Sequence, residues 1–313
     1  MTETRTTCPY CGVGCGVIAS RAPHGQVSVR GDEQHPANFG RLCVKGAALG
    51  ETVGLEGRML FPEVDGERAT WPQALAAAGS RLREIIDRHG PQAVAFYASG
   101  QLLTEDYYAA NKLMKGFIGA ANIDTNSRLC MSSAVTGYKR ALGADVVPCS
   151  YEDVENSDLV VLVGSNAAWA HPVLYQRLAQ AKRDNPQMRV VVIDPRRTAT
   201  CDIADRHLAL APGSDGGLFV GLLNAIAASG AISDDFNDAQ RALTIAQDWD
   251  LDKVAQFCGL PRQQIADFYR EFIAAPRAIT LYTMGINQSA SGSDKCNAII
   301  NVHLASGKFG RPG

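Results

Sequence analysis

The sequence predicts an α/β protein in which a small N-terminal domain precedes one or more doubly wound, mainly parallel sheets. Short runs of β-branched residues alternate with helical patterns along most of the chain, which is the rhythm of βαβ units. Four of the nine cysteines fall within the first 43 residues, and turn-forming residues are frequent at 50–72. We therefore place the domain boundary near residue 60 and expect domains over 1–60 and 61–313.

Five apolar runs are expected to form strands. Each run is continuous and rich in β-branched or aromatic residues, as in strands buried on both faces. Ligands of such a sheet bind in crevices at the carboxyl ends of the strands. The runs are AVAFYAS at 93–99, DLVVLVG at 158–164, RVVVID at 189–194, HLALA at 207–211 and AITLYTMG at 278–285.

Helical patterns lie between these runs. Thr70, which Trp71 and Pro72 follow, is typical of an N-cap, and its helix is expected to extend to about Arg88. A second helix is expected over 104–119. Its predicted buried face consists of Tyr107, Ala110, Met114, Phe117 and Ile118.

The C-terminal end of the sequence follows a helix expected over 293–306. Only the glycine-rich segment 307–313 comes after it, and no further packed element is predicted. We therefore expect the sequence to be cut at this point and not finished.

Composition and charge exclude several classes of function. The chain has 313 residues, 46% of them hydrophobic, and a formal net charge of -2. No global positive potential exists to attract nucleic acid or an anionic membrane. No secretory leader is recognisable before Cys8 and no apolar run is long enough to cross a membrane, so a cytoplasmic location is expected. In a reducing compartment cysteines bind metals or act in catalysis more often than they form disulfides.

Four cysteines form the strongest motif. Cys8, Cys11 and Cys15 share one tight loop, and Cys43 follows after 27 intervening residues. Four thiolates hold a four-iron four-sulfur cluster, and glycines beside them allow the backbone to approach the sulfurs closely. Structural zinc is the alternative, but it more often uses two Cys-x2-Cys knuckles, so the spacing favours the cluster.

Several motifs together resemble one known family. It is the molybdopterin oxidoreductase family, and within it the catalytic subunits of bacterial assimilatory nitrate reductases. The resemblance covers essentially the whole chain, but family members are considerably longer, so it implies the N-terminal part of such a subunit. The motifs are CPYCGVGCG at 8–16, LCVKG at 42–46, SGQ at 99–101 and TNSRLCMSSAV at 125–135.

The resemblance implies a metal centre at Cys130. In the family, two molybdopterin guanine dinucleotides and one protein ligand hold molybdenum, and Cys130 matches that ligand. A soft thiolate suits such a sulfur-rich centre. Without the motif, a lone cysteine at the start of a helix is more often a small buried hydrophobe.

The resemblance also implies a reaction and an electron path. Nitrate would be reduced to nitrite by oxygen-atom transfer to molybdenum, with electrons delivered through the cluster. Lys45 matches the family lysine between cluster and pterin, although by itself it would be interpreted as a solvated surface lysine. The electron donor is expected to be ferredoxin, flavodoxin or an NADH-linked reductase, and the sequence does not distinguish among them.

Further residues match family positions that contact the pterin cofactors. Most follow predicted strands, where N–H groups, arginines or an acidic group can bind phosphate, ribose or guanine. On their own they are also compatible with ordinary turns, a solvated charged loop, an acid at a helix N-terminus, or core packing at the methionine. The residues are Gln101, Asn126, Gly164, Ser165, Asn166, Asp194, Pro195, Arg196, Arg197, Gly213, Ser214, Asp215, Met284 and Gln288.

Two histidines are expected to be structural. His171 precedes the helix-opening Pro172, and His303 shares a helical face with Cys296 and Ile300. The remaining cysteines, at 149, 201, 258 and 296, are expected to be plain thiols.

Two alternative functions remain open. A formate dehydrogenase has the same fold and cofactors, but in that branch a histidine typically follows the metal ligand, whereas Met131 follows Cys130 here. A non-catalytic electron-transfer subunit would keep the cluster and lack molybdenum, and the retention of Cys130 in its motif argues against it. A further alternative concerns this chain itself: without the C-terminal part of its family it would bind only the cluster, or no cofactor.

Overall fold

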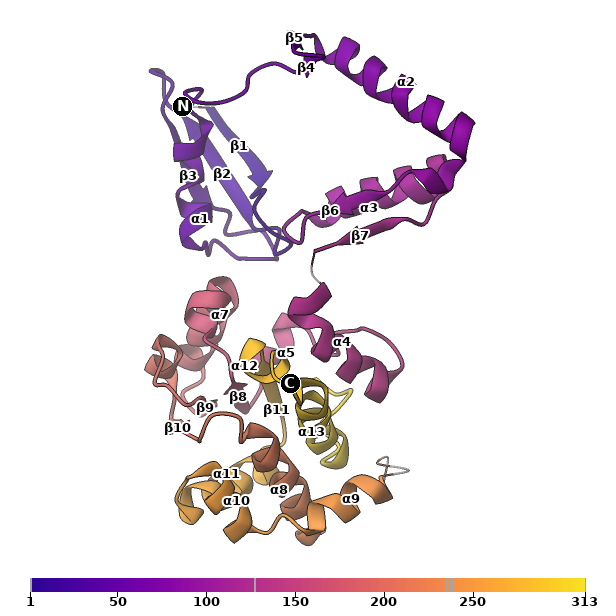
Figure 1. Ribbon diagram of the computed structural model, residues 1–313. Coiled ribbons are helices and arrows are strands. Elements are labelled where there is room, and N and C mark those ends of the chain that lie inside the picture. Colours follow the sequence, from indigo (N-terminus) through magenta and orange to yellow (C-terminus); the bar gives the residue numbers. More distant parts are fainter. Residues whose placement is uncertain (1, 127, 235, 237–238, 313) are drawn as a thin grey trace. The chain divides into compact units, whose positions relative to one another are not determined.

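The chain divides into two compact units, Met1–Arg128 and Leu129–Gly313 (Figure 1). The computed structural model describes residues 2–126, 128–234, 236 and 239–312. Both units mix helices and strands, and the second contains a parallel sheet, so the predicted α/β class is confirmed.

The first unit begins with a three-stranded antiparallel sheet in the order β1 (Thr2–Thr7), β2 (Gly16–Arg21), β3 (Val27–Gly31). Pairing of Thr7 with Gly16 places the first three cysteines in the connection between β1 and β2. Val17 and Ile18 of the central strand are buried. The short helix α1 (Val44–Ala47) and the 3-10 turn η1 (Leu49–Val53) follow.

The rest of the first unit contains the predicted helix at the domain boundary. Helix α2 (Trp71–His89) has Thr70 as its N-cap, and the Thr70 N–H donates to Gln73 Oε1 at 2.8 Å, so this prediction is confirmed. Only Phe96–Ala98 of the first predicted strand is extended. The remaining elements are β4 (Glu63–Val64), β5 (Glu67–Arg68), η2 (Pro91–Ala93), β6 (Phe96–Ala98), α3 (Thr104–Asn111), η3 (Lys112–Ile118) and β7 (Ile123–Thr125).

The helical face predicted over 104–119 is wrong at one position. Met114 is 1% exposed, as expected, but Phe117 is 76% exposed. Residues of η3 form a π-helix, whose i→i+5 hydrogen bonds place more than 3.6 residues in each turn. This extra residue rotates the last turn, so positions spaced for an α-helix no longer share a face.

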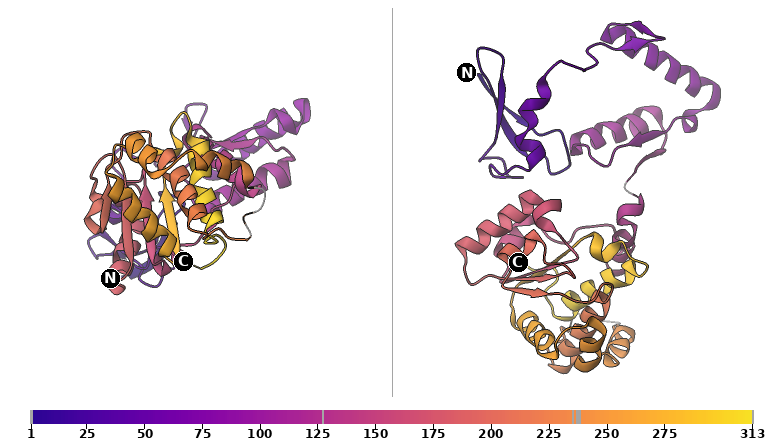
Figure 2. Two further views of the ribbon diagram at one scale, coloured as in Figure 1. Left: turned by 90° about the horizontal axis from the view of Figure 1, so that it is seen from below. Right: turned by 60° about the vertical axis from the view of Figure 1, so that its left-hand side comes forward.

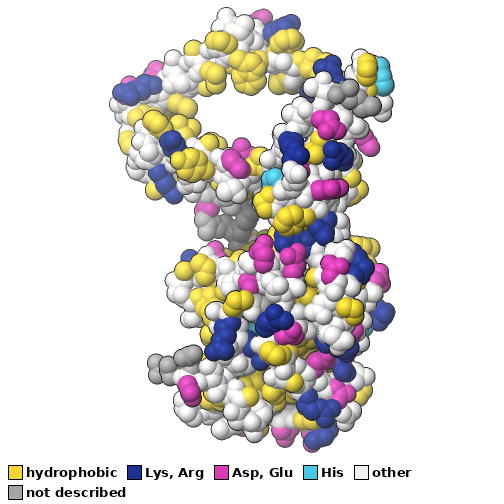
Figure 3. Space-filling view, turned by 180° about the vertical axis from the view of Figure 1, so that it is seen from behind, with side chains coloured by type: hydrophobic (Ala, Val, Ile, Leu, Met, Phe, Trp, Pro, Cys, Tyr) yellow, Lys and Arg dark blue, Asp and Glu magenta, His cyan; other side chains and the backbone are white. Residues whose placement is uncertain are grey.

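Many hydrophobic side chains of the first unit are exposed. Helix α2 is apolar along one side, yet none of its residues is buried. Hydrophobic patches are visible on the upper part of the molecule in Figure 3. The exposed large hydrophobic residues of α2 are Trp71, Leu75, Leu82 and Ile85.

The second unit is built on a four-stranded sheet in the order β10 (Arg206–Leu208), β9 (Arg189–Ile193), β8 (Leu159–Val163), β11 (Ala278–Tyr282). All three pairings are parallel, as predicted from the apolar runs. The chain passes from β8 outward to β10 and then returns to place β11 on the other side of β8. The sheet therefore has its topological switch point between β8 and β11.

Two hydrophobic layers cover the two faces of this sheet. Val161, Val163 and Ile193 face a core formed with α8, α10, α11 and α13, whereas Val160 and Val192 face a core formed with α5 and α7. Figure 2 (right) shows α7 on one side of the strands and the orange helices on the other. This alternation confirms the predicted doubly wound sheet.

Two helices predicted for the second unit are present. Pro172 opens α7 and Ala305 ends α13, as expected. Among the residues that the structure describes, no helix is long and apolar enough to cross a membrane. The elements are α4 (Arg128–Leu142), α5 (Tyr151–Asn156), α6 (Ala167–Ala170), α7 (Pro172–Asp184), η4 (Ala199–Ile203), α8 (Asp215–Ala228), α9 (Gln240–Gln247), α10 (Leu251–Cys258), α11 (Arg262–Ala274), α12 (Met284–Asn287) and α13 (Gly292–Ala305).

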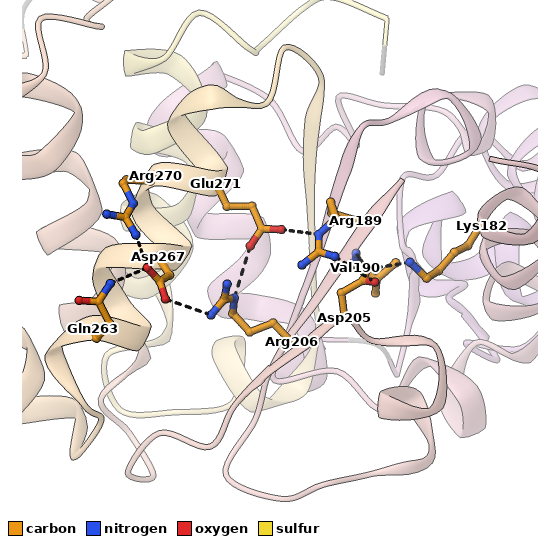
Figure 4. A network of polar contacts seen from close by, with 9 residues as sticks. All are labelled: Lys182, Arg189, Val190, Asp205, Arg206, Gln263, Asp267, Arg270 and Glu271. Carbon is orange, nitrogen blue, oxygen red and sulfur yellow. Dashed lines mark hydrogen bonds and ion pairs between the residues drawn. The ribbon is translucent and has the colours of Figure 1, made fainter. Parts of the chain in front are cut away.

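A network of ion pairs lies at the amino ends of β9 and β10 (Figure 4). Glu271 of α11 accepts from Arg189 Nε at 2.8 Å and from Arg206 Nε at 3.4 Å. Asp205 accepts from Lys182 Nζ at 2.6 Å and from the Val190 N–H at 2.7 Å. These bonds join α7, the two strands and α11 at the edge opposite to the switch-point loops.

Candidate functional site

The four N-terminal cysteines gather around one loop. The Cys8 N–H donates to the Cys15 carbonyl at 2.8 Å and the Gly14 N–H to the Cys11 carbonyl at 3.2 Å, which closes the loop tightly. Gly14 has φ of 63°, a left-handed conformation that a side chain would oppose. Cys43 is the N-cap of α1.

The sulfurs are close enough to influence one another electrostatically. Burial raises the pKa of the Cys15 thiol, and with the contributions of the Cys8, Cys11 and Cys43 thiols the pKa reaches about 11. Burial also raises the pKa of Cys8, and a hydrogen bond from the Tyr10 N–H partly opposes this. Thiolates gathered in this way repel one another until a cation binds, so the set suits a positively charged iron core.

A cluster and a single metal ion make different demands on these thiols. In the described part of the chain, no three thiol, imidazole or carboxylate groups converge so as to hold one metal ion. Each thiolate of a four-iron cluster binds a separate iron atom, so convergence on one point is not required. The four thiols lie on one loop and on the segment that returns to Cys43, and their assignment as cluster ligands stays a prediction.

Lys45 is an exposed residue of α1. Its Nζ lies 5.8 Å from the centroid of the Tyr10 ring, within the range of a cation–π contact. Because Tyr10 belongs to the cysteine loop, this contact holds the ammonium group beside that loop. The predicted role between the two cofactors is not tested by this contact.

Gln101 and Asn126 follow two paired strands. Strands β6 and β7 are parallel, with Ala98 opposite Thr125, so the residues after them leave the same sheet edge. The Gln101 N–H donates to Ser99 Oγ at 3.2 Å, and both predicted side chains are exposed. The structure thus brings these two residues to one edge of the first unit.

Gly164 occupies the switch point of the second unit. Its φ is 55°, and a Cβ at this position would lie 2.8 Å from the Gly285 Cα. The Gly164 carbonyl accepts from Thr283 Oγ1 at 2.8 Å and from the Gly285 N–H at 3.1 Å. The backbones that follow β8 and β11 therefore touch, which only two glycines allow.

Cys130 lies in the first turn of α4 with its side chain exposed. Gln288 Nε2 donates to Cys130 Sγ at 3.4 Å, and Asn287 Nδ2 donates to the Cys130 carbonyl at 2.9 Å. Both amides belong to the segment directly after β11. The predicted pair Cys130 and Gln288 is thus adjacent, and the positive end of the α4 dipole favours a negative charge there.

Asn287 is a contributor that sequence reasoning missed. It is buried, whereas Gln288 and Met284 are exposed. Asn287 Oδ1 has no hydrogen-bond partner among the described residues. The only sequence signal was its position beside Gln288 after a strand.

Hydrogen bonds to Thr200, in the segment after β9, hold the loop after β8 in place. Ser165 is buried, and Asn166 Oδ1 accepts from Thr200 Oγ1 at 3.0 Å. The same Thr200 oxygen accepts the Ala168 N–H at 3.2 Å. Thr200 was not predicted, since a buried threonine after a strand carries no distinctive pattern.

The segment after β9 presents two arginines. Asp194 Oδ1 accepts the Arg196 N–H at 2.9 Å, which turns the chain outward at Pro195. Arg196 and Arg197 are exposed, and neither pairs with a carboxylate in the part of the chain that the structure describes. Free guanidinium groups at the carboxyl edge of a sheet suit an anionic ligand.

The segment after β10 is arranged differently. Gly213 has φ of 88°, and Ser214 is buried with its Oγ donating to the Ala211 carbonyl at 2.7 Å. Asp215 forms a buried ion pair with Lys295 of α13, at 2.7 Å. Its carboxylate is therefore already neutralised, and any contact with a cofactor would come from the backbone of this segment.

The two discounted histidines have structural surroundings. His171 is the N-cap of α7, and burial lowers its pKa. His303 Nε2 lies 2.8 Å from Thr280 Oγ1, and its ring packs edge-on against Phe272. All nine cysteines are free thiols.

The fold and these sites define a class: a doubly wound α/β protein with a thiol loop at its N-terminus and an exposed thiol at the switch point. Residues 1–54 match the model of the molybdopterin oxidoreductase Fe4S4 domain, and residues 58–313 match that of molybdopterin oxidoreductase. The chain belongs to the molybdopterin oxidoreductase family. The predicted iron–sulfur domain and molybdopterin association are thereby confirmed.

Among known proteins, the chain is similar to nitrate reductases. It is 99% identical over 313 residues to a nitrate reductase of Klebsiella oxytoca. This alignment covers all of this chain and 36% of that protein. It is 39% identical over 328 residues to a nitrate reductase of Synechocystis, which covers 99% of this chain and 46% of that protein. The chain therefore spans less than half the length of these relatives and matches the N-terminal part of the Klebsiella protein.

A solved structure has the same fold. Acetylene hydratase from Pelobacter acetylenicus aligns with a TM-score of 0.77 at 22% identity, covering 98% of this chain and 44% of that one. At this identity the likeness supports the fold alone.

Proposed function

We propose that this chain is the N-terminal part of the catalytic subunit of a molybdenum nitrate reductase, which reduces nitrate to nitrite. The observation that carries the proposal is the exposed Cys130 thiol beside the Gln288 amide at the carboxyl edge of the sheet. A soft ligand presented in this way suits a molybdenum centre. The names of the similar proteins support nitrate as the substrate.

The two metal sites use separate cysteines. Cys8, Cys11, Cys15 and Cys43 hold the four-iron four-sulfur cluster, and Cys130 binds molybdenum. When bound, the molybdenum centre supplies two-electron oxygen-atom transfer, so nitrate, two electrons and two protons give nitrite and water. The Asn287 amide fixes the backbone of Cys130, and the Gln288 amide donates to its sulfur.

The pterin cofactors are proposed to be two molybdopterin guanine dinucleotides. The loops after β8, β9 and β10 would hold their charged and polar parts, because Arg196 and Arg197 are free for phosphate and Asn166 is fixed by Thr200. Met284 and Gln288 would contact a pterin after β11, and Gln101 and Asn126 would contact one from the first unit. The other residues of these loops are Gly164, Ser165, Asp194, Pro195, Gly213, Ser214 and Asp215.

The role of this enzyme would be nitrate assimilation in the cytoplasm. Nine free thiols are consistent with a reducing compartment. Electrons would come from ferredoxin, flavodoxin or an NADH-linked reductase and pass through the cluster. Cell fractionation with a cytoplasmic marker enzyme tests the location.

Metal analysis and activity of the anaerobic holoenzyme test the function. We expect four irons, four sulfides and one molybdenum per chain, and nitrate reduction with a reduced viologen dye. One zinc in place of the irons would contradict the cluster. Formate oxidation without nitrate turnover would contradict the substrate and leave the cofactors intact.

Lys45→Met tests the electron path. A positive charge between two anionic centres favours electron transfer between them, so its loss should slow reduction of molybdenum through the cluster. The matched control is Lys112→Met, because Lys112 Nζ also lies 5.8 Å from a tyrosine ring, that of Tyr108. In stopped-flow reduction, equal rates for both variants and wild type would show that Lys45 is not on the path.

A further inference from the structure

Asn38 joins the two stretches of chain that carry the cluster cysteines. It lies between Cys15 and Cys43 in the sequence and is 0% exposed. Its Oδ1 accepts the Gly16 N–H at 2.8 Å, and its Nδ2 donates to the Gly16 carbonyl at 3.1 Å. The same Nδ2 donates to the Arg41 carbonyl at 2.8 Å. One side chain thus binds both polar groups of the residue after Cys15 and the carbonyl two residues before Cys43.

The surrounding backbone leaves little room for another arrangement. The Gly16 carbonyl also accepts the Asp32 N–H at 2.9 Å, and the Gly40 N–H donates to the Asp32 carbonyl at 2.9 Å. A Cβ on Gly31 would lie 2.0 Å from the Gly40 carbonyl oxygen. The segment that returns to Cys43, residues 38–42, is therefore pressed against the end of β3 and bonded to the start of β2, which leads away from the cysteine loop.

Backbone strain accompanies this arrangement. Phe39 has φ of 44°, in the left-handed region that a bulky side chain disfavours. Such strain persists only where neighbouring contacts determine the conformation, and it concentrates at functional sites. Asn38 directly before it, and Gly40 directly after it, supply those contacts.

We propose that Asn38 is the positioning residue of the iron–sulfur site. It sets the location of Cys43 relative to Cys15, and it keeps the Gly16 N–H engaged, so this amide does not donate to a sulfur of the cluster. The inference rests on the cluster ligands of the proposed function. Hydrogen bonds to the sulfurs and access of solvent set the reduction potential of such clusters, so Asn38 acts on that potential through Gly16.

Two substitutions in the holoenzyme separate this role from general stabilisation. Asn38→Ala frees the Gly16 N–H and opens a space for water, so the midpoint potential of the cluster should become more positive. Asn38→Asp keeps an acceptor for the Gly16 N–H, loses both donated bonds and adds a negative charge, so the potential should become more negative. Loosening alone would shift both variants in the same direction.

Iron retention and spectroscopy give further readouts. Substitution of residues that orient metal ligands typically lowers metal affinity by about 10- to 100-fold. We therefore expect iron release to ferrozine to be about 10-fold faster in both Asn38 variants than in wild type. The electron paramagnetic resonance spectrum of the reduced cluster should also change. The matched control is Asn122→Ala, because Asn122 Nδ2 donates to the carbonyls of Gln92 and Val94 in the same unit, outside the cysteine loop and the returning segment.

Each result of these measurements either supports or overturns the proposed role of Asn38. Opposite shifts of potential in the two Asn38 variants, with an unchanged control, support the proposal. Wild-type potential, spectrum and iron release in either Asn38 variant overturn it, as do parallel shifts in both. If Asn38→Ala does not fold, the midpoint potential of Asn38→Asp is the test. A more negative potential than wild type supports the proposal, and a more positive potential overturns it. A wild-type holoenzyme without four irons would instead contradict the proposed function.

Discussion

The two edges of the four-stranded sheet use charge in opposite ways. At the amino edge Arg189, Arg206 and Lys182 are paired with Glu271 and Asp205 (Figure 4). At the carboxyl edge, two arginines after β9 have no carboxylate partner among the described residues, and the Cys130 thiol is exposed. The same strands form both edges of the sheet. The difference in charge pairing therefore comes from the residues that precede the strands at one edge and follow them at the other.

This comparison suggests a division between stability and binding. Charges that are paired within the chain contribute to folding and are not available to a ligand. Groups that remain without a partner in the chain do little for folding and are available to an anion or a metal. Substitutions at the amino edge should therefore change stability, and those at the carboxyl edge should change turnover.

Cys130→Ala should have the largest effect. Nitrate turnover of the holoenzyme should fall to background, while the iron content and the thermal unfolding curve remain those of wild type, because the exposed thiol contributes little packing. Cys149→Ala is the control and should retain turnover, since Cys149 packs against the core formed with α5 and α7. Residual turnover above one tenth of wild type would show that the thiol is not the metal ligand.

Gly164→Ala tests the contact at the switch point. The left-handed backbone costs an alanine about 1–2 kcal/mol, and the overlap with Gly285 adds about 1–3 kcal/mol, so both stability and nitrate turnover should fall. Gly230→Ala is the control, because Gly230 has φ of 74° and no atom within 4 Å of an added Cβ. Urea unfolding should show a loss at Gly230 of only about 1–2 kcal/mol, with turnover unchanged. Equal losses at the two glycines would argue against a close backbone contact.

Glu271→Gln tests the amino edge. It weakens two bonds to arginines in a partly buried network, so the free energy of unfolding should fall by about 1 kcal/mol without any change in turnover. Asp252→Asn is the control, since its pair with Arg262 is exposed and should contribute less than about 0.5 kcal/mol. A loss of turnover in Glu271→Gln would contradict the separation of the two edges.

Protonation of Asp205 at acid pH should have the smallest effect, a loss of part of the free energy of unfolding. Burial tends to raise the pKa of Asp205, but the bonds from Lys182 and the Val190 N–H outweigh it, so the folded pKa lies below the ordinary value. The carboxylate therefore contributes stability above about pH 4, and this contribution is lost as the pH falls through the lowered folded pKa. Unfolding of wild type and Asp205→Asn should differ at pH 7 and converge at lower pH. A difference that grows toward acid pH would have the wrong sign.

Much of the fold was predictable because its signals are local. Apolar runs identified β8, β9 and β11, and the Thr70 signature located the start of α2. The orientation of Phe117 was not predictable, because a π-helix has no sequence period of its own and the α-helical spacing fails within it. The division of the chain at Arg128 also has no turn-rich signal comparable to that at 50–72.

The candidate site was predictable where motifs mark it. Cys130 and Gln288 were found by resemblance, and the structure places their side chains in contact. Asn38, Asn287, Thr200 and Lys295 were missed, because each acts by a hydrogen bond or ion pair to a residue distant in the sequence. Such partners become apparent only when the chain is folded.

The pairing of β11 with β8 has a consequence for biosynthesis. Residues paired across these strands are separated by 119 positions, and a ribosome adds about 5–20 residues per second, so β8 waits roughly 10 s for its second neighbour. During that time one side of an uncharged LVVLV strand is open, which is the kind of edge that recruits other nascent chains. The backbone contact at the switch point, which needs both strands, is then among the last parts of this sheet to form. Slower translation between β10 and β11 would lengthen the exposure of β8 to chaperones and to aggregation alike.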